Sequence, residues 1–216
     1  TAGGIKAASG VSHKKNDQKA TAAAWADLKE QLGDRPAQLV IVFCRANVEG
    51  KAVMDTLKPL VGPKATVIGG TTANGVLSDD GLGRIGILAF SGLGAGVGVG
   101  VSEGAGQIET AEKAGSSAMQ QAMELSCLVN LGLSTKDLDL MLVFSAPGFE
   151  DFVFKGISEQ LAAPVPVFGG SFADDSATKD IAPGKWWQLV GSEKGWKLYK
   201  DAVIVLPLVL FANVSF

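Results

Sequence analysis

The chain has 216 residues, of which 47% are apolar and 19% charged, and its formal net charge is −3. These proportions favour a compact folded protein and exclude an intrinsically disordered chain. The mild acidity and the absence of a dense Lys/Arg stripe exclude a nucleic-acid partner, because such surfaces are far more basic.

The first half of the chain predicts strands that alternate with helices. Apolar residues recur at helical spacing in the predicted helices, and the predicted strands are continuous apolar runs of the kind buried on both faces of a sheet. Such alternation indicates βαβ units. In chain order, the expected elements are a strand ending at 10–12, a helix over 19–32, a strand over 38–43, a helix over 49–60 and a strand over 67–71.

The second half predicts the same series again. A strand ending at 100–102 precedes a helix over 109–125, a strand over 140–145, a helix over 150–161 and a strand over 165–171. Both series place Gly-Val-Ser at the first strand, an aromatic residue near the end of the second, and a glycine pair in the third. A shared order of this kind is the signature of internal repetition.

The spacing of matched residues supports a duplication. Phe43 and Phe144 are 101 residues apart, and Gly70 and Gly170 are 100 apart. We therefore predict an α/β fold of duplicated βαβ-type halves with mixed sheets, helices packed on the sheet faces and a pseudo-two-fold internal repeat.

We expect one domain over 1–216, with repeat halves at about 5–90 and 95–206. Additional strands are expected at 85–90, 97–101, 187–190, 196–198 and 202–206, and the pair at 187–190 and 196–198 reads as a hairpin.

Small polar residues follow matched strands in both halves. In α/β sheets, ligands bind beyond the carboxyl ends of the strands. Glycines there let a ligand approach the backbone, and each hydroxyl offers one donor and two acceptor positions. The alternative is that the glycines form tight turns and the hydroxyls cap helices. The candidate ligand-binding residues are Cys44, Arg45, Gly70, Thr71, Thr72, Ser145, Gly170 and Ser171.

Two of these loops resemble signature segments of the FIST N domain family. Residues 70–75, Gly-Thr-Thr-Ala-Asn-Gly, are similar to the family's glycine and Ser/Thr segment. Residues 169–175, Gly-Gly-Ser-Phe-Ala-Asp-Asp, are similar to its second signature, a Gly-Gly-Ser-Ala-like loop with acidic residues after it. The resemblance extends from about Ile5 to Leu206 and implies a sensory domain of signal-transduction proteins. It also implies a small-molecule ligand, with amino acids among the candidates.

The resemblance also implies a FIST C domain after this point and a linked signalling domain. We therefore expect the chain to be a fragment, or a FIST-like fold reused in an assembly. The first hypothesis is a non-catalytic ligand-binding sensory module. The alternative is a structural or adaptor subunit of a larger protein assembly, which would have protein partners.

We expect no enzymatic activity and no cofactor. A third, weaker hypothesis is a Cys-dependent enzyme in which His13, the only histidine, activates Cys44. The lysines that follow His13 favour an exposed loop, and a buried cysteine is usually inert packing.

Two further motifs receive little weight. Residues 81–86 match the dinucleotide fingerprint by letter, but a strand follows them where the motif requires a helix. Acidic pairs in loops are mostly solvated, so we expect no metal site. These pairs are Asp79 with Asp80 and Asp174 with Asp175.

The two cysteines, Cys44 and Cys127, fit no zinc spacing and no disulfide framework, which favours a reducing compartment. We expect the cytoplasm or another reducing intracellular compartment, including an organelle after loss of a targeting peptide. No membrane span is expected. The uncharged stretch 85–102 is glycine-rich and strand-like, and 202–216 is shorter than the ~20 residues that a span needs.

Overall fold

A computed structural model describes residues 4–93, 97–126, 128–173 and 186–210. The chain forms two compact units. The first unit contains residues up to 92 together with 172–200. The second unit contains 93–171 together with the residues from 201 onward.

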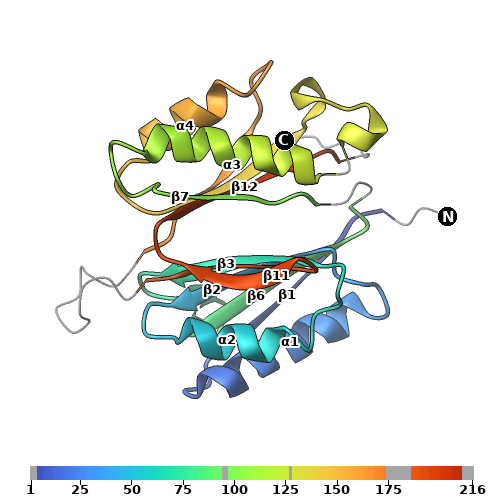
Figure 1. Cartoon of the computed structure of the whole chain (residues 1–216). Coiled ribbons are helices and arrows are strands. Elements are labelled where there is room, and N and C mark those ends of the chain that lie inside the picture. Colours follow the sequence, from blue (N-terminus) through green and yellow to red (C-terminus); the bar gives the residue numbers. More distant parts are fainter. Residues whose placement is uncertain (1–3, 94–96, 127, 174–185, 211–216) are drawn as a thin grey trace. The chain divides into compact units, whose positions relative to one another are not determined.

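The first unit is a six-stranded mixed sheet with two helices on one face (Figure 1). The only parallel pairing between its neighbouring strands is that of β2 with β3. In spatial order, the strands are β1 (Lys6–Ser12), β6 (Ile85–Ser91), β2 (Leu39–Arg45), β3 (Thr66–Thr72), β10 (Gln188–Ser192) and β11 (Gly195–Tyr199). The helices are α1 (Asp17–Leu32) and α2 (Gly50–Leu57).

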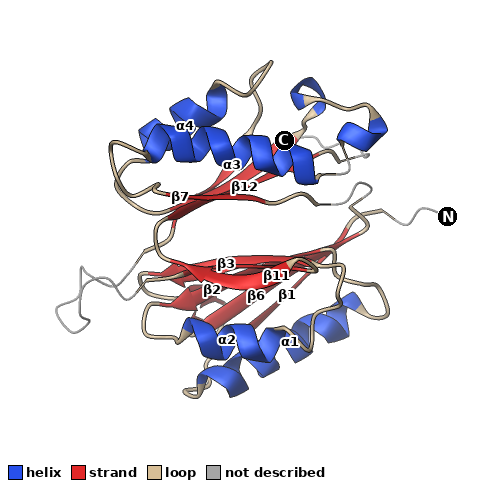
Figure 2. Cartoon of the chain, viewed as in Figure 1, coloured by secondary structure: helices blue, strands red, loops and turns tan. Residues whose placement is uncertain are grey.

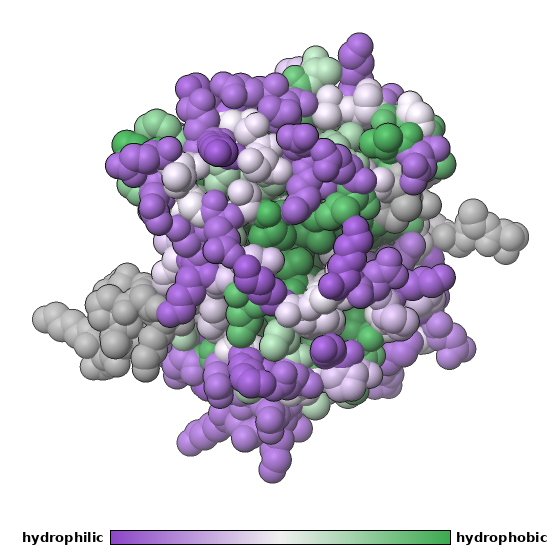
Figure 3. Space-filling model, in the orientation of Figure 1, coloured by the Kyte–Doolittle hydropathy of each residue, from purple (hydrophilic) through white to green (hydrophobic). Residues whose placement is uncertain are grey.

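Helix α1 covers the sheet with a stripe of small and apolar residues. Asn16 caps its start by accepting a hydrogen bond from the Lys19 N–H at 2.9 Å, and Gly33 ends it with a φ of 67°. Its buried residues recur at helical spacing and pack with β2 into one core. The surface over α1 and α2 is mainly hydrophilic (Figure 3), as expected of helices that face solvent on one side.

The second unit is a four-stranded mixed sheet, again with two helices on one face (Figure 2). Its strands in spatial order are β7 (Gly100–Glu103), β12 (Ala202–Leu208), β8 (Leu140–Ser145) and β9 (Val167–Ser171). Its helices are α3 (Ala111–Leu125) and α4 (Glu150–Ser158), and two 3-10 turns lie at Val129–Leu131 and Thr135–Asp137.

Helices α3 and α4 cross closely because each places a glycine at the contact. A β-carbon on Gly115 would overlap the Val153 carbonyl, and one on Gly156 would overlap the Glu112 carbonyl. Both glycines are therefore required by packing between the two helices.

The strand order confirms the predicted fold class and the duplication. The order β1-β6-β2-β3 in the first unit corresponds to β7-β12-β8-β9 in the second, and the helices occupy matching places along the chain. Phe43 lies opposite Gly70 across β2 and β3, as Phe144 lies opposite Gly170 across β8 and β9. The matched residues found in the sequence are thus equivalent in topology and in register.

The compact units do not coincide with the repeat halves. The predicted hairpin at 187–198 forms as β10 and β11, but β10 pairs with β3, so a segment of the second half in sequence extends the sheet of the first unit. A short hairpin of β4 (Val76–Ser78) and β5 (Gly81–Gly83) was not predicted. That the whole chain acts as one domain stays a prediction. Within the described ranges, no helix is both long and apolar enough to cross a membrane.

Candidate functional site

The structure brings the candidate residues of each unit together at the ends of paired strands. In the first unit, Cys44 lies opposite Thr71 and Arg45 lies opposite Thr72 across the parallel pair of β2 and β3. Residues opposite each other on adjacent strands share a face of the sheet. We call this group, with Gly70, the first corner.

Cys44 is fully buried among the core residues of the first unit. Burial raises the pKa of its thiol far above the ordinary range, the negative charge of Asp17 raises it further, and the positive charge of Arg84 opposes both. The residue is therefore a neutral thiol at physiological pH, and such a thiol is a poor nucleophile.

Two aromatic residues close the first corner around Thr71. Its hydroxyl oxygen accepts a hydrogen bond from the Trp187 N–H at 3.2 Å, and its own N–H donates to the Trp187 carbonyl at 3.1 Å. The Phe172 ring packs so closely on Gly70 that a β-carbon there would overlap it. Thr71 is consequently buried and already hydrogen-bonded.

The rim of the first corner is a tight turn. The Thr72 hydroxyl donates to the Gly75 carbonyl at 2.9 Å and accepts from the Gly75 N–H at 3.0 Å. Gly75 has a φ of 98°, a left-handed conformation that favours glycine. Arg45 is exposed beside this turn. The Thr72 hydroxyl therefore supports a tight turn, and these contacts are not the helix cap that the alternative expected of the hydroxyls.

The equivalent residues of the second unit have different surroundings. Ser145 lies opposite Ser171 across β8 and β9, so their side chains share a face of the sheet. Ser145 is only 4% exposed, yet its hydroxyl has no hydrogen-bond partner within the described residues. Gly170 is exposed, and a β-carbon there would meet nothing within 4 Å.

Glu150, the first residue of α4, completes this group and is not among the residues predicted from the sequence. Its carboxylate accepts hydrogen bonds from the Ser171 hydroxyl and, at 3.0 Å, from the Gly148 N–H. Burial raises the pKa of Glu150, but the hydrogen bonds from Ser171, from its own N–H and from Gly148 lower it, and the net result is a lowered pKa. We call Ser145, Gly170, Ser171 and Glu150 the second corner.

The second corner combines an ionised carboxylate with two hydroxyl groups. A carboxylate only accepts hydrogen bonds, whereas a serine hydroxyl both donates and accepts. The group can therefore receive the N–H donors of an ammonium or amide and offer one donor to an acceptor. No signal in the sequence pointed to Glu150 except its place at the start of a helix after β8.

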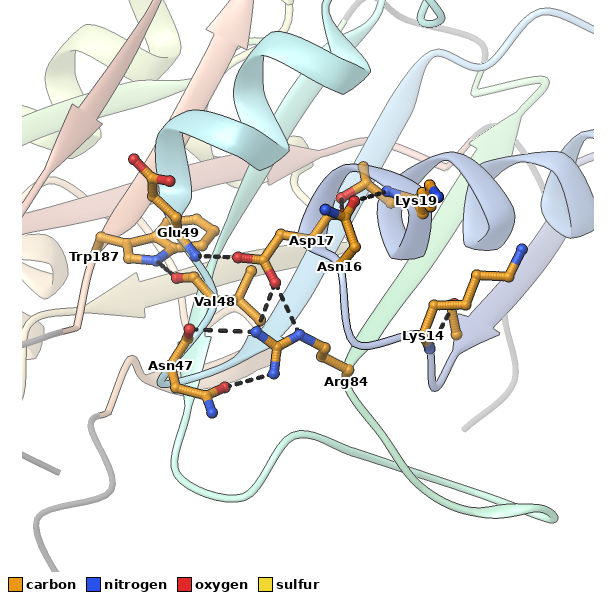
Figure 4. A network of polar contacts seen from close by, with 11 residues as sticks. Lys14, Asn16, Asp17, Lys19, Asn47, Val48, Glu49, Arg84 and Trp187 are labelled. Carbon is orange, nitrogen blue, oxygen red and sulfur yellow. Dashed lines mark hydrogen bonds and ion pairs between the residues drawn. The ribbon is translucent and has the colours of Figure 1, made fainter. Parts of the chain in front are cut away.

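A polar network ties the elements around the first corner together (Figure 4). The Asp17 carboxylate accepts hydrogen bonds from Arg84 at 2.8 and 2.6 Å and from the Glu49 N–H at 3.0 Å. Arg84 also donates to the Asn47 side chain at 2.9 Å. The starts of α1, α2 and β6 are thus held by one carboxylate.

Comparison with known proteins identifies the family. The model of the FIST N domain matches residues 38–210. The chain belongs to the FIST N domain family. Both segments that resembled the family's signatures lie inside this range.

No curated protein matches this FIST N domain. Among solved structures, one similar chain is described as cyanuric acid hydrolase from A. caulinodans. It is 9% identical with a TM-score of 0.45, and the match covers 95% of this chain and 67% of that one. A second cyanuric acid hydrolase structure is 10% identical with a TM-score of 0.43 and the same coverage.

Of the remaining motifs, some lie in the first unit and the others lie outside the described residues. His13 is exposed, with its Nδ1 atom 3.2 Å from the Leu82 carbonyl oxygen, whereas Cys44 is buried in the core. Residues 81–86 run through β5 into β6, so no helix comes after them. Asp79 and Asp80 are exposed in the β4–β5 turn, while Asp174, Asp175 and Cys127 lie outside the described residues.

Proposed function

We propose that this FIST N domain is a non-catalytic sensory module that binds a small molecule at the second corner, with an amino acid as the leading ligand class. Membership of the family supports the general role. The observation that carries the location is the buried Ser145 hydroxyl, which has no hydrogen-bond partner among the described residues.

A buried polar group without a partner costs about 1–3 kcal/mol of stability. Groups of this kind are rare in folded proteins, and a functional role is one explanation for them. A ligand that hydrogen-bonds Ser145 would remove this cost. The free energy regained in this way would contribute to binding.

The neighbouring groups select the ligand chemistry. The Glu150 carboxylate, already oriented by Ser171 and Gly148, attracts a positively charged ammonium group. Ser145 and Ser171 share a face of the sheet, so a ligand that reaches Ser145 lies beside the pair of Ser171 and Glu150. A small molecule with an ammonium group and a hydrogen-bonding polar group matches this arrangement.

A thermal-shift screen with the proteinogenic amino acids and their amine analogues tests the proposal. We expect at least one to raise the melting temperature in a saturable manner, because a ligand that binds the native state stabilises it. Ser145→Ala should abolish that shift and leave the unliganded protein at least as stable. Ser158→Ala, an exposed serine at the far end of α4, is the matched control and should retain the shift.

An adaptor role is the second candidate, and the first corner favours it. There, Phe172 packs on Gly70 and Trp187 is hydrogen-bonded to Thr71, whereas the equivalent Gly170 has open space beside it. If no ligand shifts the melting temperature, or if Ser145→Ala keeps the full shift, binding at the second corner is wrong. The adaptor role would then take its place.

A further inference from the structure

A small basic cavity lies in the first unit, whereas the second corner belongs to the second unit. Its volume is about 160 Å³. It lies where the β4–β5 hairpin meets the loop after β1 and the end of β2. The lining residues are His13, Lys15, Arg45, Leu82, Gly83 and Arg84, and none of them is acidic.

The positive charges around this cavity are only partly compensated. Arg84 is paired with Asp17 and also donates to Asn47, which fixes its guanidinium (Figure 4). Lys15 and Arg45 are exposed, and neither forms an ion pair within the part of the chain that the structure describes. Of the three cationic side chains Lys15, Arg45 and Arg84, only Arg84 is therefore paired with a carboxylate, that of Asp17.

Contacts between neighbouring segments hold the cavity wall in place. The Nδ1 atom of His13 lies 3.2 Å from the Leu82 carbonyl oxygen, a contact between the loop after β1 and the β4–β5 hairpin. Gly83 is buried, and a β-carbon there would overlap the side chain of Val11. The Arg45 N–H donates to the Arg84 carbonyl at 2.9 Å, which anchors the two arginines side by side.

The size of the cavity limits what it can hold. Pockets for drug-sized ligands have volumes of about 300–1,000 Å³. A cavity needs a volume of only about 10–15 Å³ to hold one water molecule. A cavity of about 160 Å³ therefore admits a group of several non-hydrogen atoms but not a nucleotide.

We propose that this cavity binds a small oxyanion, a carboxylate or a phosphate group, between Lys15 and Arg45. Arginine matches both groups with two parallel N–H···O hydrogen bonds, and lysine adds a point charge. The inference does not depend on the proposed function, because it uses other residues in the other unit.

The test is a titration of the ¹⁵N-labelled chain with orthophosphate and, separately, with acetate, at constant ionic strength in chloride. We expect saturable shifts of the Gly83 and Arg84 amide signals. Tighter binding of orthophosphate would assign a phosphorylated ligand, and tighter binding of acetate a carboxylate. Lys15→Gln and Arg45→Gln should each weaken the binding by about tenfold, because each removes a charge-assisted contact.

Lys14→Gln is the matched control, since Lys14 is also exposed and adjacent but does not line the cavity. It should change the affinity by less than about twofold, because exposed charges outside a site are screened. Equal weakening by Lys14→Gln and Lys15→Gln, or no saturable shift with either anion, would overturn the proposal. Ser145→Ala should leave the anion titration unchanged, which separates this cavity from the second corner.

Discussion

Thr71 and Ser171 occupy the same place in the two copies but have opposite surroundings. Thr71 is buried and bonded to the Trp187 backbone, whereas Ser171 is exposed and donates to Glu150. The difference comes from the neighbour of each strand: β10 pairs with β3, and the described residues contain no strand in the same place beside β9. A hydroxyl at a strand end is therefore structural or available according to its neighbours.

The Ser171 hydroxyl should control the pKa of Glu150. Ser171→Ala removes one of the hydrogen bonds that lower this pKa, so we expect the pKa to rise. A carboxyl whose folded-state pKa is lowered stabilises the fold above its unfolded pKa, and this contribution is lost as the pH falls through the folded value. In Ser171→Ala the lost contribution should therefore be smaller, and the loss should be complete at a higher pH, because the folded-state pKa lies closer to the unfolded one.

Carboxyl ¹³C chemical shifts followed over pH measure this change. Asp137 provides an internal control, because its lowered pKa depends on the backbone and side chain of Ser134 instead. An unchanged pKa of Glu150 in Ser171→Ala, with Asp137 also unchanged, would contradict the hydrogen bond between Ser171 and Glu150.

Cys44 should resist alkylation in the native protein. Its thiol is fully buried, and burial raises its pKa, so very little thiolate is exposed to the reagent. We expect iodoacetamide, at a mildly alkaline pH, to modify Cys44 only after unfolding in urea, as measured by mass spectrometry of its peptide. Modification of folded protein at the rate of a free cysteine would instead revive the hypothesis of a Cys-dependent enzyme.

At the scale of elements, Asp17 connects three segments that the sequence separates widely. Asp17→Ala removes the partner of Arg84 and of the Glu49 N–H. Since hydrogen bonds to charged groups contribute about 1.5–3 kcal/mol, we expect the free energy of unfolding to fall by about that amount. Urea denaturation measures it.

Asp55→Ala is the matched control for Asp17→Ala. Asp55 also pairs with a basic residue, Lys51, but both side chains are largely exposed. Exposed pairs of this kind contribute little, so the urea midpoint should scarcely change. Equal losses for the two variants would show that the Asp17 network does not hold the elements together.

The sequence predicted the strands and helices of both copies because local patterns define them: continuous apolar runs for β2 and helical spacing for α1. It did not predict β4 and β5. Each has only three residues, two of them glycine in β5, and such a strand is too short for a periodic signal. The pairing of Asp17 with Arg84, and the closure of the first corner by Trp187, also escaped it. Both join residues far apart along the chain, and no local pattern encodes such contacts.

At the scale of the whole chain, both copies share the same close packing of the first helix on the first strand. Gly10 in β1 lies under α1, and Gly100 in β7 lies under α3. A β-carbon on Gly10 would overlap the Ala24 carbonyl oxygen, and one on Gly100 would overlap that of Ala118. Each copy thus requires a glycine where the first helix crosses the first strand, because the helix backbone occupies the space of a side chain.

Gly10→Ala and Gly100→Ala should therefore have similar effects. Forcing a methyl group into a packed interior costs about 1–3 kcal/mol, and we expect each variant to lose that much in urea denaturation. Gly62→Ala is the control, since Gly62 is exposed and a β-carbon there meets nothing within 4 Å. A large loss for one glycine and none for its counterpart would mean that the two copies share strand order but not helix packing.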